Sequence, residues 1–407
     1  MAIHSDATIV VGIPTRNEAE TVADVARAVD KGLQKLRPGG SNIILNADNS
    51  STDGTGQAFL SANTVASKKL VYTPSLNSGK GTNVLAIMAT ALEMDADYAL
   101  IIDGDLRSAE PWWIGKLINA VVHDAPTIAV PLYQRHRFDS NTTNHLISPL
   151  LAATFGRVLR QPIGGEFAFN RAFLQQATSW PQPESASLYG IDIHLTANAV
   201  REGCNVVEVS LSQKLHKPAL PKTFFVQQQV LDAFFRVMST MDRPQQIPFD
   251  CNIPKIIISS APASPEPQLV AKVMGRCARY IENNTSDIAT LFPSVIGLPE
   301  CPWGPWISTA RWPGVLIDAL RGLANGHFHR SRDHLVALYV SRLMTFWQEI
   351  EHRTNAEVAN LLQQQFDDIV KVVAKNSMEF SGPPESAALN AGYWGEIQSE
   401  WNEVLRA

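Results

Sequence analysis

The chain has 407 residues, of which 45% are hydrophobic and 18% charged, so it is long enough for a sizeable core and for two domains. Its formal net charge of −5 argues against a general nucleic-acid-binding protein, which needs a basic surface. The longest apolar runs fall far short of a membrane span, and the opening residues MAIHSDATIVVGIP lack the features of a secretory signal, so we expect a cytoplasmic protein without a membrane partner.

Short runs rich in Val, Ile and Leu alternate with helical patterns over the first 240 residues. A helix is predicted from the i, i+3, i+4, i+7 stripe of apolar residues that begins at Val22, and another from the strong helix formers of 81–94. Apolar strands that alternate with helices are typical of a mainly parallel sheet covered on both faces. Residues 1–245 therefore predict an α/β domain, with strands at 8–14, 42–48, 69–74, 98–105 and 127–133.

A second region is predicted over residues 246–407. The stretch APASPEP at 261–267 reads as a loop or linker, and 334–353 and 356–375 have helical patterns, so this region is expected to be mainly α-helical. Its tryptophan residues suit helix packing or a subunit interface. We therefore expect the C-terminal region to serve in oligomerisation, with a homodimer as the predicted state, and as a lid over the active site.

Two carboxylates end the predicted strand at 98–105, with only Gly104 between Asp103 and Asp105. On an extended chain, residues two apart emerge on the same face, and ligands of an open parallel sheet gather outside the carboxyl ends of its strands. Oxygen ligands at such a place suit Mg²⁺ or Mn²⁺ together with substrate phosphates. The alternative is an ordinary turn before the next helix, which is predicted to begin near Pro111.

Polar side chains also follow the first two predicted strands, with Arg16, Asn17 and Glu18 after the first and Asp48 at the end of the second. Lys80 then lies between two glycines at a helix start, where backbone N–H groups and a cation could meet an anion. A Walker loop is excluded, because it needs a glycine at position 74 and a Ser or Thr after Lys80. No G-x-G-x-x-G follows the first strand, which disfavours a dinucleotide site.

Taken together, the blocks resemble the retaining GT-A glycosyltransferases, in particular the enzymes that make glucosyl- and mannosyl-glycerates (mannosylglycerate synthase and glucosyl-3-phosphoglycerate synthase). The resemblance covers roughly residues 8–240 and rests on several blocks in order. They are PTRNE at 14–18, STDGT at 51–55, GKG at 79–81, D-x-D at 103–105, RQPIGGEFAFNR at 160–171, YGIDIHLT at 189–196 and KLHKP at 214–218.

The resemblance implies a donor site for a nucleoside-diphosphate hexose such as UDP-glucose or GDP-mannose. Asp105 and His216 would hold Mg²⁺ or Mn²⁺, and Lys80 would meet the diphosphate. Asp103 would lie beside the sugar and ribose. The implied donor-binding residues are Pro14, Arg16, Asn17, Glu18, Asp48, Lys80, Asp103 and Gly104.

The resemblance also implies an acceptor site, made by Gly164, Gly165 and Glu166 with Asp192, which with Asp103 is a candidate catalytic residue. The relatives that use phosphoglycerate carry an arginine before the glycine pair, where this chain has Asn141 or Thr142. Nearby Arg135 and Arg137 could replace it. The missing arginine favours unphosphorylated glycerate or a similar small hydroxy acid, with Thr143 and Asn144 as hydrogen-bonding candidates.

The expected function is therefore metal-dependent, retaining transfer of a hexose, glucose or mannose, to D-glycerate or a close analogue, as in compatible-solute synthesis. One alternative acceptor is 3-phosphoglycerate. A sugar nucleotidyltransferase is a second alternative, disfavoured because IPTRNEAE lacks the glycine-rich loop of those enzymes. A third is a non-catalytic nucleotide-sugar-binding protein, disfavoured because Lys80, Asp103, Asp105 and His216 are all present.

Overall fold

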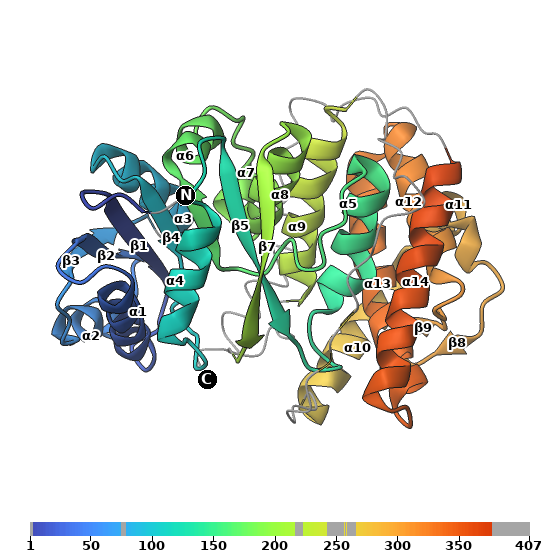
Figure 1. Cartoon of the computed structure of the whole chain (residues 1–407). Helices are drawn as coiled ribbons and strands as arrows, with labels where there is room; N and C mark the ends of the chain where they lie inside the picture. The colour runs from blue at the N-terminus through green and yellow to red at the C-terminus, as the bar shows by residue number, and fades with distance from the viewer. Residues whose placement is uncertain are drawn as a thin grey trace. The chain divides into compact units, whose positions relative to one another are not determined.

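The computed structural model describes residues 3–74, 79–215, 223–241, 256, 258 and 266–376 (Figure 1). The chain divides into two compact units, the first formed by Met1–Gln134 with Gln161–Lys217 and the second by Arg135–Arg160 with Pro218–Ala407. This division differs from the predicted boundary between residues 245 and 246, because 135–160 and 218–245 belong to the second unit. No periodicity in the sequence marks an inserted segment such as 135–160.

The first unit is the predicted α/β domain. Along the chain its elements are β1 (Thr8–Thr15), α1 (Val22–Leu36), β2 (Ser41–Asp48), α2 (Thr55–Ser61), β3 (Ser67–Tyr72), α3 (Lys80–Glu93), β4 (Tyr98–Ile101), α4 (Pro111–Ala120), β5 (Thr127–Gln134), β6 (Phe167–Asn170), α6 (Arg171–Ala177), α7 (Glu184–Ser187), α8 (Ile191–Arg201) and β7 (Asn205–Gln213). The five predicted strands are all present. Strands β6 and β7 were not predicted. Strand β6 has only four residues, and Glu208 and Ser210 interrupt the apolar run of β7.

The seven strands form one mixed sheet in the order β3-β2-β1-β4-β6-β5-β7. Strand β6 runs antiparallel to both its neighbours, and the other pairs are parallel. The amino end of β6 therefore lies at the same edge as the carboxyl ends of β4, β5 and β7. The register shows this directly, because Phe167, the first residue of β6, pairs with Ile101, the last of β4.

Helices cover both faces of this sheet, as the apolar strands predict. Ile9, Val11 and Ile13 of β1 are fully buried in one core cluster with residues of α1 and α4, among them Leu33 and Trp113. On the opposite face, a Cβ added at Gly12 would lie 2.3 Å from Ile87 of α3. The alternation of side chains along the strand thus sends one set to α1 and α4 and the other to α3.

Helices dominate the second unit, which also contains a short two-stranded sheet. Its elements are a π-helix η1 (Thr143–Ile147), α5 (Ser148–Phe155), α9 (Thr223–Met238), α10 (Pro267–Asn283), α11 (Thr285–Leu291), a 3-10 helix η3 (Pro293–Val295), β8 (Glu300–Cys301), β9 (Gly304–Pro305), α12 (Trp312–Ala324), α13 (Phe328–Ile350) and α14 (Asn355–Lys375). Both helices expected from the C-terminal patterns are confirmed as α13 and α14. The predicted linker at 261–267 lies almost wholly outside the described residues, and α10 begins at its last residue.

A buried arginine helps to hold the second unit together. Arg342 of α13 is fully buried, and it donates to Glu349 at 2.7 Å, to the carbonyl of Ile307 at 3.1 Å and to Gln365 of α14 at 3.0 Å. A buried charge is tolerated where it is paired and its hydrogen bonds are satisfied, as here. Among the helices that the structure describes, none is long and apolar enough to cross a membrane.

Candidate active site

Five charged side chains meet at the edge of the first unit's sheet where β4 and β7 end and β6 begins. Asp103 follows β4, Lys214 follows β7 directly, and Glu166 stands immediately before β6. Lys80 and Asp192 come from the first turns of α3 and α8. We call these residues the charge cluster: Lys80, Asp103, Glu166, Asp192 and Lys214.

The carboxylate of Asp103 lies at the centre of the charge cluster and bridges the two lysines. Its Oδ1 is 2.8 Å from the Lys80 Nζ, and its Oδ2 is 3.1 Å from the Lys214 Nζ. Lys80 also lies 3.3 Å from Asp192 Oδ1, and Lys214 lies 2.8 Å from Glu166 Oε2. The side chains of Lys80, Asp103 and Asp192 keep 14% to 18% of their surface exposed, so a ligand can reach them, whereas Glu166 is fully buried.

The cluster holds three carboxylates and only two ammonium groups, and this imbalance sets its proton affinities. Burial by itself would lower the pKa of Lys80, but the carboxylates of Asp103 and Asp192 outweigh burial and raise it. Burial favours the neutral form of Asp103, yet Lys80 and Lys214 hold the pKa of this carboxyl well below its ordinary value. Burial prevails at Glu166, whose pKa rises to about 7, and it also raises the pKa of Asp192.

The raised pKa of Glu166 predicts a pH dependence of stability. Between pH 4.5, the ordinary pKa of a glutamate side chain, and about pH 7, Glu166 keeps its proton in the folded protein. In the unfolded chain the same group has already lost its proton in this range. The free energy of unfolding should therefore fall as the pH rises through this window, by about 3 kcal/mol. Glu166→Gln removes the group and keeps its size, so urea unfolding of the variant should lack this fall. Parallel pH profiles for wild type and variant would contradict the prediction.

Gly165 lets the cluster close around the backbone. Its φ is +101°, and a Cβ added there would lie 2.6 Å from Asp103 Oδ2 and 2.8 Å from Lys214 Nζ. The glycine pair, which is expected to lie at the acceptor site, contacts the two lysines through its carbonyl groups. The carbonyl of Gly164 accepts a hydrogen bond from Lys214 at 2.8 Å, and that of Gly165 accepts one from Lys80 at 3.4 Å. The pair therefore fixes the two lysines.

The glycines beside Lys80 serve packing, and the expectation of an open backbone nest for an anion is wrong. The N–H of Gly79 donates to the carbonyl of Ser187 at 3.1 Å, and that of Gly81 donates to the carbonyl of Leu188 at 2.8 Å. Both groups are thus satisfied inside the protein. The Lys80 side chain, which points into the charge cluster, remains as an anion-binding element of GKG.

The close contact of α3 with the 186–188 segment makes Gly81 sensitive to substitution. A Cβ added at Gly81 would lie 1.9 Å from the carbonyl oxygen of Ala186, so Gly81→Ala should destabilise the first unit by about 3 kcal/mol. Gly115→Ala in α4 is the matched control, because its Cβ would meet only Leu36 at 3.8 Å. The control should be neutral or stabilising by up to about 1 kcal/mol. Equal thermal unfolding of the two variants would contradict the packing explanation.

The two polar loops that follow β1 and β2 are hydrogen bonded to one another. Asn17, with a φ of +58°, accepts from the N–H of Thr52 at 3.0 Å, and the N–H of Glu18 donates to Thr55 Oγ1 at 2.8 Å. Asp48 is almost fully buried and accepts from Thr15 at 2.9 Å and from Ser51. The structure therefore brings the predicted nucleoside-binding residues together at the ends of β1 and β2. Among them Arg16 is exposed and Pro14 is buried.

Asp105 does not share the position of Asp103, because β4 ends at Ile101 and the chain turns at Gly104 and Asp105. The expected strand through Asp105, with both carboxylates on one face, is wrong. Asp105 is half-buried, and among the described residues no hydrogen bond or ion pair engages its carboxylate. Its predicted partner His216 lies outside the described residues.

The chain just before His216 is nevertheless hydrogen bonded to Arg107 and Ser108, which follow Asp105 closely in the sequence. The N–H of Arg107 donates to the carbonyl of Leu215 at 3.0 Å, and the N–H of Leu215 donates to Ser108 Oγ at 2.9 Å. Carboxylate and imidazole are suitable ligands for Mn²⁺ and carboxylate for Mg²⁺. By residue type, Asp105 and His216 suit a divalent cation, and the assignment stays a prediction because His216 lies outside the described residues. No group of three or more His, Cys, Asp or Glu side chains able to hold a metal occurs in the part of the chain that the structure describes.

The other predicted acceptor residues, Thr143 and Asn144, belong to the second unit. Thr143 is buried at the start of η1, and the carbonyl of Asn144 accepts from Gln365 at 3.3 Å. The two candidate replacement arginines also have partners in this unit. Arg135 pairs with Asp139 at 2.9 Å, and Arg137 donates to Asn355 at 2.9 Å and to the carbonyl of Arg353 at 2.8 Å.

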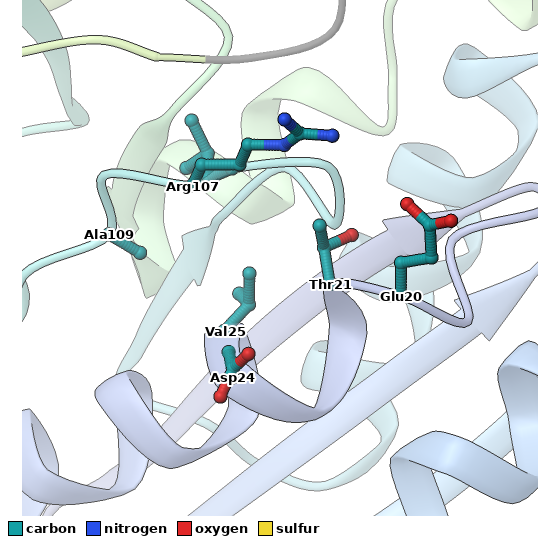
Figure 2. A pocket seen from close by; sticks show the side chains of 7 residues that line it. Glu20, Thr21, Asp24, Val25, Arg107 and Ala109 are labelled. Carbon is teal, nitrogen blue, oxygen red and sulfur yellow. The ribbon is translucent and has the colours of Figure 1, made fainter.

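A pocket of about 360 Å³ lies between the start of α1 and the segment that follows Asp105 (Figure 2). No member of the charge cluster lines it, and neither does any predicted site residue. One hydrogen bond connects the pocket wall to the D-x-D turn, from Thr21 Oγ1 to the carbonyl of Gly104 at 2.7 Å. The pocket is lined by Glu20, Thr21, Asp24, Val25, Leu106, Arg107 and Ala109.

A family comparison decides the class of this site. Residues 10–179 match the glycosyl transferase family 2 domain, a span that contains both polar loops, Lys80, Asp103 and Glu166. A glycosyltransferase domain thus matches residues 10–179, most of which lie in the first unit. The mixed sheet with helices on both faces is the GT-A fold of such a domain, and both the predicted fold and the predicted enzyme class are confirmed. A sugar nucleotidyltransferase and a non-catalytic binding protein, the two alternatives, lack this support.

Solved structures similar to the chain include glucosyl-3-phosphoglycerate synthase from Mycobacterium tuberculosis in complex with phosphoglyceric acid. The sequence identity is 22% and the TM-score is 0.47. The match covers 60% of this chain and 82% of the synthase chain. Complexes of the same synthase with Mn²⁺, UDP and phosphoglyceric acid, and with Mg²⁺ and UDP, are 23% identical, with TM-scores of 0.47 and 0.46. They cover 60% of this chain and 80% and 81% of theirs. Both expected cations are thus present in those structures. No curated protein sequence matches the chain.

Two members of the glycosyltransferase domain's site were missed by sequence reasoning. Lys214 was part of the KLHKP block but was given no role, and its place directly after β7 was the available signal. Tyr133, whose hydroxyl donates to Glu166 at 2.8 Å, is an aromatic residue in an apolar strand and carries no sequence signal of its own.

Proposed function

We propose that this glycosyltransferase moves a hexose, glucose or mannose, from a nucleoside diphosphate to a hydroxyl of D-glycerate or a close analogue, with Mg²⁺ or Mn²⁺ bound by Asp105 and His216. One observation carries the proposal. Asp192 Oδ1 is buried and accepts no hydrogen bond from any described residue, although it lies 3.3 Å from Lys80. A hydroxyl of the acceptor can satisfy this oxygen next to the cation that receives the diphosphate.

The charge cluster supports a division of roles in the transfer. Lys80 contacts Asp192 and the carbonyl of Gly165 only at 3.3 to 3.4 Å, so it can exchange these contacts for a phosphate oxygen. Asp103, held between two ammonium groups, stays ionised and lies where the donor's ribose and sugar are proposed to bind. The bound cation would supply charge neutralisation for the departing nucleoside diphosphate.

The raised pKa of Asp192 suits the proposed contact with the reacting hydroxyl. Asp192 belongs to the first turn of α8, and its carboxylate keeps 14% of its surface exposed toward a ligand. A carboxylate with a raised pKa is a stronger base than an ordinary one, so it can orient the hydroxyl and take its proton as the new bond forms. Retention of the anomeric configuration is expected from the resemblance.

The contacts of Arg135 and Arg137 favour an acceptor without a phosphate. A phosphate needs free guanidinium or ammonium donors, and both arginines have partners within the second unit. Glucosyl-3-phosphoglycerate synthesis remains the second candidate, because the resemblance extends to enzymes of that activity. The predicted homodimer is likewise part of the proposal, and sedimentation equilibrium of the full chain tests it.

A product assay by mass spectrometry tests the function. The full chain is incubated with Mn²⁺ or Mg²⁺, with UDP-glucose, GDP-mannose and related donors, and with either D-glycerate or 3-phosphoglycerate. We expect a metal-dependent hexosyl-glycerate, and the anomeric coupling constant of the product gives the stereochemistry. A product from 3-phosphoglycerate alone would overturn the acceptor assignment. Donor hydrolysis without transfer to either acceptor would overturn the whole glycerate proposal.

A further inference from the structure

Glu166 cannot meet an acceptor in the way the sequence suggests, because its carboxylate is already engaged. The side chain is fully buried, and both oxygens lie within 2.9 Å of Lys214 Nζ. Oε2 also accepts a hydrogen bond from the Tyr133 hydroxyl at 2.8 Å. The earlier assignment of Glu166 as an acceptor-binding residue is therefore corrected, and the carboxylate requires another explanation.

Lys214 has no donor to spare. An ammonium group has three N–H bonds, and among the described residues Lys214 Nζ donates to the carbonyl of Gly164 at 2.8 Å, to Glu166 at 2.8 Å and to Asp103 Oδ2 at 3.1 Å. Its side chain is 6% exposed. The two lysines of the cluster therefore differ. Lys80 has one short contact, to Asp103 at 2.8 Å, and longer contacts of 3.3 to 3.4 Å to Asp192 and Gly165, whereas these contacts of Lys214 are all 3.1 Å or shorter.

Tyr133, a residue of β5, holds the Glu166 carboxyl group through its hydroxyl. Tyr133 is 3% exposed, and the centre of its ring lies 5.5 Å from Lys214 Nζ. Its backbone N–H donates to the Gln161 side chain at 3.1 Å, and its backbone carbonyl accepts from the same side chain at 2.7 Å. A hydroxyl on a rigid strand thus orients the Glu166 carboxylate. Groups locked by packing and by hydrogen bonds of this kind hold catalytic side chains in their working geometry.

We propose that Glu166 and Tyr133 are positioning residues, which hold the Lys214 ammonium against Asp103 and so fix the orientation of the Asp103 carboxylate toward the donor. This inference rests on the proposed function of the same site. It assigns the acceptor no contact with Glu166. It also explains why a third carboxyl group is buried beside two others, since a residue without its two oxygen acceptors would leave Lys214 free to turn away from Asp103.

Kinetics of two variants test the proposal in the full chain. Glu166→Gln should lower kcat about 30-fold while the KM for glycerate stays within two-fold of wild type. Tyr133→Phe, which removes one hydrogen bond, should lower kcat about three-fold with the same unchanged KM. The matched controls are Glu93→Gln at the exposed end of α3 and Tyr72→Phe on the exposed edge strand β3, and both should keep wild-type values. A raised glycerate KM with unchanged kcat in Glu166→Gln would show acceptor binding and overturn the proposal.

A second measurement does not depend on catalysis. In protein labelled with ¹⁵N at lysine Nζ, a buried ammonium bonded on three sides gives a protected NH₃⁺ signal, which the Lys214→Met variant assigns. We expect this signal to disappear in Glu166→Gln and to persist in Glu93→Gln. A Lys214 signal that survives in Glu166→Gln overturns the positioning role. A wild-type chain with no transfer in any donor and acceptor combination would refute the proposed function, and the ammonium signal would still decide whether Glu166 holds Lys214.

Discussion

Replacing Asp105 with asparagine is expected to abolish Mn²⁺-dependent binding of a nucleoside diphosphate. The carboxylate of Asp105 has no hydrogen bond or ion pair among the described residues, so its removal leaves the rest of the site intact. An amide oxygen is a much poorer ligand for a hard divalent cation than a carboxylate. Isothermal titration of UDP or GDP in the presence of Mn²⁺ should show affinity at least 100-fold weaker, with wild-type thermal stability.

The control for Asp105 is Asp124→Asn, an exposed carboxylate near the amino end of β5, at the opposite edge of the sheet. Its nucleotide affinity should equal that of wild type. A titration in EDTA gives the second comparison, because wild type without metal should bind nucleotide as weakly as Asp105→Asn with it. Unchanged affinity of Asp105→Asn in Mn²⁺ would refute the metal assignment.

Lys80→Met is expected to reduce kcat/KM for the donor about 1,000-fold. The substitution keeps the length of the side chain but removes the cation that is proposed to meet the diphosphate, and loss of such a charge-stabilising group typically costs 100- to 1,000-fold. It also leaves Asp103 and Asp192 without their shared partner. Breaking a buried ion pair on one side costs about 3 kcal/mol of stability.

A double variant separates the two effects of Lys80→Met. Adding Asp192→Asn removes the carboxylate that has no other cation within ion-pair distance in the described structure, so the double variant should recover much of the lost stability without recovering transfer. Lys69→Met, on the exposed face of edge strand β3, is the matched control and should have wild-type kinetics and stability. Transfer within ten-fold of wild type in Lys80→Met would remove Lys80 from the donor site.

The sequence was informative where local chemistry determines structure. Apolar runs located the strands from β1 to β5, and the D-x-D, GKG and YGID blocks supplied Asp103, Lys80 and Asp192, which the structure brings together. The antiparallel strand β6 could not be predicted, because its direction depends on pairing with β4 and β5 and not on its own four residues. For the same reason the burial of Glu166 could not be predicted, since it follows from the position of that strand.

The glycines of GKG illustrate a second kind of error. A Gly-Lys-Gly at a helix start has the same local sequence whether its N–H groups bind a phosphate or another part of the chain. Only tertiary structure reveals that the N–H groups of Gly79 and Gly81 bind the carbonyls of Ser187 and Leu188. Lys214 was overlooked for a related reason, because Asp103, Gly164 and Glu166, to which it donates, lie 48 or more residues away along the chain.

The hydrogen bonds between the start of α3 and residues 187–188 also bear on how this enzyme could be re-engineered. They join the backbone that carries Lys80 to the backbone that leads into Asp192. Lys80 and Asp192, the proposed donor-side cation and acceptor-side carboxylate, are thus connected through backbone hydrogen bonds, and their spacing does not depend on side-chain contacts alone. A graft of a foreign α7–α8 segment, made to change the acceptor, would shift Lys80 as well unless the matching α3 start is transplanted with it.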